Sequence, residues 1–522
     1  MRPLNLVVVH NHFRPGGVRR VIELAAPHLV RTLRPQPRGI VLAAGEAPDA
    51  PWLQRFRAGV APLSVVCRLN PALGYIAEQR LTPAARARRL RMFFAGLFDA
   101  TPAGGCVVWA HNMGLGRNLT LARELARACA ARDLPLVFHH HDWWFDNRWR
   151  RWPEMRRSGF RTLAQVAAAI LPAAPGFRHA AINQADAAVL YRHFRGRAGW
   201  LPNLADAAQQ PAPARVRHVR RWLTARLGDD APVWLAPCRL LRRKNLAEAL
   251  LLTRWLRPEA WLVTTGGVSS AGEQVYARRL ADAAAGAGWN LRLGILAGDE
   301  CGLPTVPELL AASEAVLLTS LQEGFGLSYI EAAAAHRPLI ARVLPNIAPD
   351  LARFGFQFPQ SYQELLVDTG LFDWAAERRR QGRLFQIWQR HLPRVCRGLA
   401  GRPALLAAGD PARPVPFSRL TLTAQLDVLR QPPEVSWRRC VPLNPFLTAW
   451  HDRAECGALG VTRWPRGADA WLSGAAYAGR FARLLAAGSP GGMRPAAGRA
   501  AQEEFIHQKL RSGNLYPLTW SP

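Results

Sequence analysis

The sequence predicts an α/β protein with two doubly wound parallel sheets, followed by a helical C-terminal region. Three observations support this class: apolar runs alternate with helical patterns over the first 200 residues, a proline- and alanine-rich segment follows over 201–215, and the alternation then restarts. The 522 residues are also too many for one hydrophobic core. We therefore predict domains over 1–205 and 206–375, and a helical extension of unknown role over 376–522.

The first domain opens with a strand, a glycine loop and a helix. Residues 4–9 (LNLVVV) form an apolar run typical of a buried strand, the loop HNHFRPGG follows, and 18–33 has helical apolar spacing. This order is the first half of a βαβ unit. The other elements predicted in this domain are strands over 39–44, 63–68, 105–110, 134–139 and 180–183, and a helix over 119–132.

The second domain repeats the alternation. Its predicted strands are 233–237, 261–265, 291–296, 315–318 and 338–343, and its predicted helices are 246–255, 275–287, 307–312 and one beginning near Ser328. Two such sheets facing each other would leave a cleft at the carboxyl ends of their strands, where open α/β folds bind ligands. In the extension, helices are predicted over 384–399, 420–429 and 471–487.

The composition narrows the class of partner. The net charge is +31, yet the basic residues are dispersed and lack the interleaved aromatics of a nucleic-acid surface, so no nucleic acid is expected. Peripheral contact with an anionic membrane is left open by this charge. No apolar stretch is long enough to span a bilayer and the start lacks a signal-peptide layout, so we expect a cytoplasmic protein. The eight cysteines form no C-x-x-C pair, which argues against disulfides and zinc ribbons.

Two glutamates bracket a glycine turn in the second domain. In SLQEGFGLSYIEAAAA, Glu323 and Glu331 stand on either side of Gly324-Phe325-Gly326, between a buried strand and a helix. Such a turn points backbone N–H groups beyond the strand end and favours an anion there. A structural alternative exists, because Ser328-x-x-Glu331 fits a capping box and would leave Glu323 as a solvated loop charge.

Four stretches together carry a resemblance to a known family. They are GGVRRVIELA at 16–25, APCRLLRRKN at 236–245, TTGG at 264–267 and EGFGLSYIEA from Glu323. In order and spacing, over about 1–375, they resemble the retaining glycosyltransferases of family 4, whose E-x7-E motif matches Glu323 and Glu331. The resemblance implies two Rossmann-like domains (the GT-B fold), a nucleotide-diphosphate-sugar donor and a glycan, lipid or small-molecule acceptor, without cofactor or metal.

The resemblance implies roles for the second-domain residues. Arg239 and Lys244 would neutralise the leaving diphosphate. Lys244 stands out because, of 68 basic residues, it and Lys509 alone are lysine. Glu331 would accept hydrogen bonds from the ribose, and Glu323 would hold donor-sugar hydroxyls near the reacting carbon. The loop predicted to bind the donor through its backbone comprises Gly324, Phe325, Gly326 and Leu327.

The first domain would contribute a glycine loop and a histidine. Gly16 and Gly17 match the loop that approaches the diphosphate and acceptor, although the next residues, Val18-Arg19, depart from the family pattern and put acceptor recognition in question. In LVFHHHDWWF, His141 best matches the family histidine near the donor sugar, with His139 as the alternative. His111 is expected to line the same cleft.

Metal binding and non-catalytic binding are the alternatives. In a strand, only His139 and His141 share a face, and with Asp142 on the other side the pair is a poor metal site. A sugar-nucleotide or glycan-binding protein without activity could have the same fold, as could a basic adaptor of nucleic acid or membrane. The nucleotide base, the donor sugar, the acceptor and the linkage are not specified by the sequence.

Overall fold

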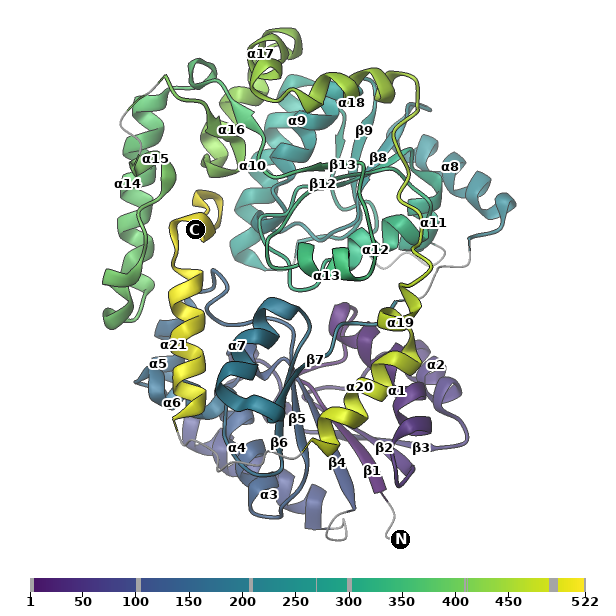
Figure 1. Cartoon of the computed structure of the whole chain (residues 1–522), viewed down its shortest axis with the longest axis vertical. Coiled ribbons are helices and arrows are strands. Elements are labelled where there is room, and N and C mark those ends of the chain that lie inside the picture. The colour runs from purple at the N-terminus through teal and green to yellow at the C-terminus, as the bar shows by residue number, and fades with distance from the viewer. Residues whose placement is uncertain are drawn as a thin grey trace. The chain divides into compact units, whose positions relative to one another are not determined.

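The computed structural model describes residues 4–99, 105–205, 210–268, 270–297, 303–407, 410, 412–487 and 496–520. The chain divides into two compact units (Figure 1). Unit 1 comprises Met1–Ala205, Arg390–Leu399 and Asp469–Leu510, and unit 2 comprises Asp206–Gln389, Ala400–Ala468 and Arg511–Pro522. Residues from 376 onward are thus shared between both units. The predicted α/β class, with two doubly wound parallel sheets and a helical C-terminal region, is confirmed.

Unit 1 is built on a seven-stranded parallel sheet in the order β3-β2-β1-β4-β5-β6-β7. Its strands are β1 (Leu4–Val9), β2 (Pro37–Ala44), β3 (Ser64–Leu69), β4 (Cys106–His111), β5 (Leu136–His140), β6 (Phe177–Ala181) and β7 (Ala198–Trp200). The inner strands are apolar because helices cover both faces of a sheet of this kind. The strand order reverses between β1 and β4, and such a switch point is where open α/β sheets bind ligands.

Helices from both ends of the chain pack around this sheet or on the helices beside it. They are α1 (Gly17–Thr32), α2 (Ala50–Val60), α3 (Pro83–Asp99), α4 (Leu119–Ala130), α5 (Arg151–Arg157), α6 (Leu163–Ile170), α7 (Gln184–Phe194), α19 (Asp469–Leu472), α20 (Gly474–Ala486) and α21 (Ala497–Lys509). Figure 1 shows the yellow α20 beside the purple α1, and Tyr477 and Phe481 of α20 enter the unit 1 core. A Cβ at Gly474 would lie 2.0 Å from the His28 ring, so this close approach requires glycine.

Unit 2 contains a six-stranded parallel sheet in the order β10-β9-β8-β11-β12-β13. Its strands are β8 (Val233–Ala236), β9 (Trp261–Thr264), β10 (Leu291–Arg292), β11 (Ala315–Leu318), β12 (Leu339–Arg342) and β13 (Gln360–Tyr362). Its order reverses between β8 and β11. A two-stranded antiparallel ribbon, β14 (Leu366–Val367) with β15 (Val415–Pro416), completes its strands among the described residues. That the two large sheets face each other across a cleft stays a prediction.

Helices in unit 2 come from the middle of the chain and from its tail. They are α8 (Pro213–Leu227), α9 (Leu246–Leu256), α10 (Ala271–Ala287), α11 (Val306–Ala312), α12 (Leu327–Ala334), α13 (Ala348–Arg353), α14 (Trp374–His391), α15 (Ala404–Ala407), α16 (Leu422–Arg430), α17 (Pro433–Cys440) and α18 (Phe446–Glu455). α14 starts before the predicted 384 and ends at His391, because Pro393 cannot continue a helix.

Two other expectations differ locally from the structure. The strand predicted over 291–296 stops at Arg292, because Gly294 turns the chain with φ +64°. The helix predicted over 471–487 is two helices, since Ser473 caps the second through a bond from the Ala476 N–H at 3.3 Å.

Within the described ranges, no helix has the length and apolar character that crossing a membrane requires. The described cysteines are free thiols; Cys301 lies outside the described residues.

Candidate functional site

The motif segments of unit 2 meet at its topological switch point. β8 and β11 pair in parallel, with Val316 opposite Leu235, so the loops that follow these two strands begin side by side. The Thr319 hydroxyl donates to the carbonyls of Lys244 and Asn245, both at 3.0 Å. The loop after β8 is therefore attached to the loop after β11 at the carboxyl edge of the sheet, where ligands of such folds bind.

Glu323 is the centre of an ion-pair cluster. Its carboxylate accepts bonds from Lys244 Nζ at 2.5 Å, from Arg243 Nη1 at 3.0 Å and from Ser320 Oγ at 2.6 Å. The side chains of Lys244 and Glu323 are 11% and 14% exposed. Burial alone would raise the pKa of Glu323, but the charges of Lys244 and Arg243 outweigh it, so the pKa is lowered to about 2. The carboxylate is therefore ionised at neutral pH.

Arg239 lies on the other side of the same loop. It is exposed, and its Cγ would lie 2.8 Å from a Cβ placed on Gly266, so it packs directly against the loop that follows β9. The Gly266 N–H donates to the Cys238 carbonyl at 2.9 Å, which ties these two loops together. The loop after β8 thus carries Arg239 toward β9 and Lys244 toward β11.

The glycine turn opens α12 without a side-chain cap. Gly326 is the N-cap residue, with φ +79°, and a Cβ there would lie 2.6 Å from Ile347 Cδ1. Because α12 begins at Leu327, Ser328 lies inside the first turn, and the capping box proposed for Ser328 and Glu331 is not formed. Glu331 belongs to the second turn of the helix and is half-buried.

The side chain of Phe325 belongs to the core of unit 2. It is 4% exposed and packs against Phe354, with 6.2 Å between ring centroids. Its contribution to a ligand site is therefore limited to its main chain, together with that of Gly324. The Asn346 side chain donates to the Glu323 carbonyl at 2.7 Å and holds this turn in place.

A cluster of histidines stands close to the switch point of unit 1. The register of β4 and β5 pairs His111 with His139, and His141 follows two residues further along the chain. His111 Nδ1 and His141 Nε2 are 3.1 Å apart. The buried His139 ring is held by the Leu201 carbonyl at 3.3 Å and the Tyr477 hydroxyl at 3.4 Å. His141 keeps 7% of its surface exposed, whereas His111 and His139 keep none.

His140 faces the opposite side of the sheet. Its Nε2 lies 3.2 Å from His179 Nδ1, and its ring stacks on Trp143 with centroids 4.3 Å apart. The three consecutive histidines therefore alternate as the strand pattern predicts. Burial lowers the pKa of His139 to about 3 and, together with neighbouring imidazoles, holds that of His141 well below its usual range. These rings are neutral at physiological pH.

Gly16 and Gly17 begin α1 on an exposed loop. A Cβ added to either glycine would meet no atom within 4 Å, so the packing of the unit does not require glycine at these positions. Arg19, at the departure from the family pattern, forms an ion pair with Asp49 and lies 5.5 Å from the Trp52 ring centroid. It anchors α1 to the start of α2.

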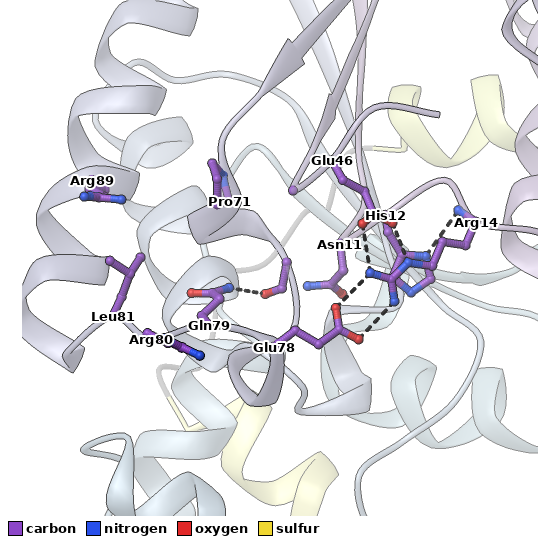
Figure 2. A pocket seen from close by; sticks show the side chains of 12 residues that line it. Asn11, His12, Arg14, Glu46, Pro71, Glu78, Gln79, Arg80, Leu81 and Arg89 are labelled. Carbon is purple, nitrogen blue, oxygen red and sulfur yellow. Dashed lines mark hydrogen bonds and ion pairs between the residues drawn. The ribbon is translucent and has the colours of Figure 1, made fainter. Parts of the chain in front are cut away.

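A pocket of about 430 Å³ lies at the carboxyl ends of β1, β2 and β3 (Figure 2). Arg14 stands between Glu46 and Glu78: its Nη1 donates to Glu78 at 2.9 Å and its Nη2 to Glu46 at 2.8 Å. The residues lining the pocket are Asn11, His12, Arg14, Gly45, Glu46, Pro71, Gly74, Glu78, Gln79, Arg80, Leu81 and Arg89. Polar groups of both signs here suit a hydroxyl-rich ligand.

Sequence reasoning named neither this pocket nor Arg243. The signal for the pocket was the polar loop HNHFRPGG, which follows the first strand directly. Arg243 stood beside Lys244 in a predicted motif, but a chain so rich in arginine gives no reason to single it out. Both were identified by their contacts, which join segments far apart along the chain.

The fold and these clusters define an α/β protein with polar groups gathered at the switch points of two doubly wound sheets. No protein-family model matches the chain. Over 359 residues it is 23% identical to the mannosylglucosyl-3-phosphoglycerate synthase of Petrotoga mobilis; this alignment covers 66% of the chain and 66% of the length of that relative.

Among solved structures, the chain is similar to the Anabaena protein HepE in complex with UDP-glucose. The TM-score is 0.45, and the identity is 18% over 67% of this chain and 88% of the HepE chain. The chain is also similar to the N-terminal domain of the Candida albicans trehalose-6-phosphate phosphatase. Here the TM-score is 0.46, and the identity is 13% over 68% of this chain and 85% of the Candida chain.

Proposed function

We propose that the chain is a retaining glycosyltransferase of family 4, with the GT-B fold, that transfers a sugar from a nucleotide-diphosphate-sugar donor to an acceptor. The observation that carries the proposal is the cluster of Lys244, Arg243 and Glu323 at the switch point of unit 2. It combines cations for a diphosphate with an ionised carboxylate for sugar hydroxyls. The curated relative, whose name is that of a glycoside-forming synthase, supports the same reaction class.

Donor binding would exchange partners within this cluster. Lys244 and Arg239, with Arg243, would neutralise the charge that develops on the leaving diphosphate. Glu323, which holds Lys244 without the donor, would accept hydrogen bonds from the sugar near its reacting carbon. Glu331 would accept from the ribose hydroxyls, and the backbone of 324–327 would donate to phosphate or sugar oxygens. The ion pair between Lys244 and Glu323 holds both side chains in place before the donor binds, and each then exchanges this contact for one to the donor.

Unit 1 would bind the acceptor and would contribute one catalytic side chain. The pocket around Arg14 offers carboxylates and guanidinium groups for acceptor hydroxyls (Figure 2). Gly16 and Gly17 would let the main chain approach the diphosphate and acceptor. His141, the most exposed of the histidines at the ends of β4 and β5, would contact the donor sugar. Acceptor attack on the face that the diphosphate leaves would retain the configuration, with the leaving phosphate taking the acceptor proton.

The reaction would need no metal or cofactor, and we place it in the cytoplasm. The net charge of +31 would be available for peripheral contact with an anionic membrane. The competing function is sugar-nucleotide or glycan binding without catalysis on the same fold.

A thermal-shift screen against UDP-, GDP- and ADP-sugars tests the proposal. One nucleotide series should stabilise the protein by about 2.7 kcal/mol at 100 times its Kd, because the ligand binds the folded state alone. With the best donor, release of nucleotide diphosphate and NMR of the product anomer then distinguish retaining transfer from binding alone. If no sugar nucleotide shifts the melting temperature, the proposed donor site is wrong.

Activity should survive EDTA. Cationic side chains and backbone amides take the part that Mg²⁺ or Mn²⁺ plays in metal-dependent transferases, so removing divalent ions should leave kcat/KM within about twofold. The measurement is donor turnover after dialysis against EDTA, compared with the same sample after Mg²⁺ or Mn²⁺ is restored. A loss on chelation that metal reverses would contradict metal-independent transfer.

Glu331→Gln should raise the donor KM roughly tenfold, about 1.4 kcal/mol, and leave the melting temperature unchanged. An amide accepts hydrogen bonds from two ribose hydroxyls less strongly than a carboxylate does. Ser328→Ala is the matched control: since Gly326 caps α12, that variant should change neither the melting temperature nor the donor KM. A comparable loss in both variants would assign Glu331 to the structure of the helix.

A further inference from the structure

Three histidines from two adjacent strands place their ring nitrogens together in unit 1. His111, His139 and His141 each offer one nitrogen, and these nitrogens lie within 4.8 Å of one another. The alternation within one strand predicts only the pair His139 and His141, which is too few ligands for a firmly held ion. The parallel register of β4 and β5 adds His111 from the neighbouring strand.

The three rings are buried, and their present contacts show what a bound cation would replace. These are the 3.1 Å contact between His111 Nδ1 and His141 Nε2, and the 3.4 Å contact between His139 Nδ1 and the Tyr477 hydroxyl. His139 Nε2 faces the Leu201 carbonyl at 3.3 Å, the contact with which metal-binding imidazoles are commonly oriented. The Nδ1 of His111 faces His141 Nε2, whereas the buried Nε2 of His111 has no hydrogen-bond partner among the described residues, so Nδ1 is the nitrogen that this ring offers to the cluster.

The ligand set selects the class of metal. Imidazole nitrogens suit zinc, copper, nickel and iron, whereas Mg²⁺ and Ca²⁺ prefer oxygen. The nearest carboxylate in sequence, Asp142, is paired with Arg148 at 3.0 Å. Two nitrogens bound about 2.0–2.1 Å from a tetrahedral zinc are roughly 3.3 Å apart. The 3.1 Å between His111 Nδ1 and His141 Nε2 is close to that spacing. The His139 nitrogen lies within 4.8 Å of both, so this third ring would move toward the pair to complete the set.

We propose that His111, His139 and His141 form a binding site for a divalent transition metal, with Zn²⁺ as the reference ion. Three imidazoles would leave a fourth position for water or an anion. Resting on the proposed function, we further infer that the bound metal inhibits transfer, because it engages the His141 nitrogen that the donor sugar would contact. The three histidines thus form an inhibitory metal site in an enzyme whose reaction itself needs no metal.

Titration of the full-length protein with Co²⁺ tests the site directly. A single site should appear with the intense visible absorption of four- or five-coordinate cobalt, and excess Zn²⁺ should abolish it. His139→Gln and His141→Gln should each weaken binding about 100-fold, at least as much as the loss of an orienting partner of a ligand. His140→Gln, buried in the same strand but facing His179, is the matched control and should bind as the wild type does.

X-ray absorption spectroscopy of the Zn²⁺-loaded wild type gives a result that does not depend on whether the variants fold. It should show imidazole scattering from three histidines at about 2.0–2.1 Å. An environment of oxygen ligands alone, weak six-coordinate cobalt spectra, or an equal loss of affinity in His140→Gln would reduce the binding to an adventitious ion and overturn the proposal.

The inhibition is measured separately from the binding. Zn²⁺ should inhibit sugar transfer over the same concentration range in which it displaces Co²⁺, and EDTA should restore full activity. Zn²⁺ binding without inhibition would overturn the inhibitory role of the metal, whereas the three-histidine site itself would stand. An absence of any transferase activity would overturn the proposed function, and the cobalt titration would still decide whether the metal site exists.

Discussion

Lys244→Ala is expected to lower kcat/KM for the donor about 30-fold or more, close to 2 kcal/mol, because it removes a charged partner of the leaving diphosphate. Lys244 lies at the switch point of unit 2 with only 11% of its side chain exposed, and its Nζ is already paired with Glu323 at 2.5 Å. A cation held this way is in place before the donor arrives, so little reorganisation is needed as the phosphate charge develops. Steady-state kinetics with varied donor concentration measures the effect.

Arg242→Ala is the matched control for this substitution. Arg242 belongs to the same short 3-10 turn as Lys244, but its guanidinium pairs with Glu273 at 3.2 Å instead of with Glu323. Its loss should leave kcat/KM within about threefold, because Arg242 pairs with Glu273 and has no part in the proposed diphosphate contacts. Lys244→Arg should recover part of the activity, since it restores charge but not the compact ammonium. Unchanged kcat/KM in Lys244→Ala, or an equal loss in Arg242→Ala, would contradict the proposed role of Lys244 as a partner of the diphosphate.

Glu323→Gln is expected to lower kcat about 100-fold, near 2.7 kcal/mol, with a donor KM that changes little. The carboxylate is ionised, because Lys244 and Arg243 hold its pKa at about 2. A hydrogen bond from a sugar hydroxyl to this charge strengthens as positive charge develops on the ring, so its contribution appears in the transition state. Glutamine keeps the shape of the side chain but removes that charge.

Comparing Glu323→Gln with substitutions of other glutamates distinguishes a role in the reaction from a role in the fold. Glu273→Gln changes a carboxylate that pairs with Arg242 in a neighbouring ion pair, and it should leave kcat near the wild-type value. Melting temperatures are needed for each variant, since removing the charge of Glu323 also leaves Lys244 and Arg243 without their shared partner. Small and equal effects of Glu323→Gln and Glu331→Gln would mean that the two glutamates serve the fold and not the reaction.

Much of the architecture could be predicted from local patterns. The first strand was predicted over 4–9 and lies at Leu4–Val9, and the strand predicted over 315–318 lies at Ala315–Leu318. Buried parallel strands are continuous apolar runs and their helices have apolar residues on one side, so each element can be recognised from its own residues. The segments that carry Arg239, Lys244 and Glu323 were instead singled out by their resemblance to the motifs of a glycosyltransferase family.

The tail and the pocket of unit 1 could not be predicted to the same degree. The sequence indicates helices after residue 376, but α20 joins the core of unit 1 whereas α16 joins that of unit 2, and helical periodicity contains no information about which core a helix will reach. The pocket depends on Glu46 and Glu78 converging on Arg14 from loops after different strands.

The sequence by itself determined which segments are strands and helices, and which residue types stand at the strand ends. Only the tertiary structure decided which of those residues meet. Glu323 reaches Lys244, 79 residues away, because β11 lies beside β8, and His111 joins His139 because β4 and β5 pair in that register. Local periodicity follows from the nearest neighbours of each residue. Strand order and register follow from burying apolar surface over the whole unit, so contacts between distant side chains are a property of the folded chain.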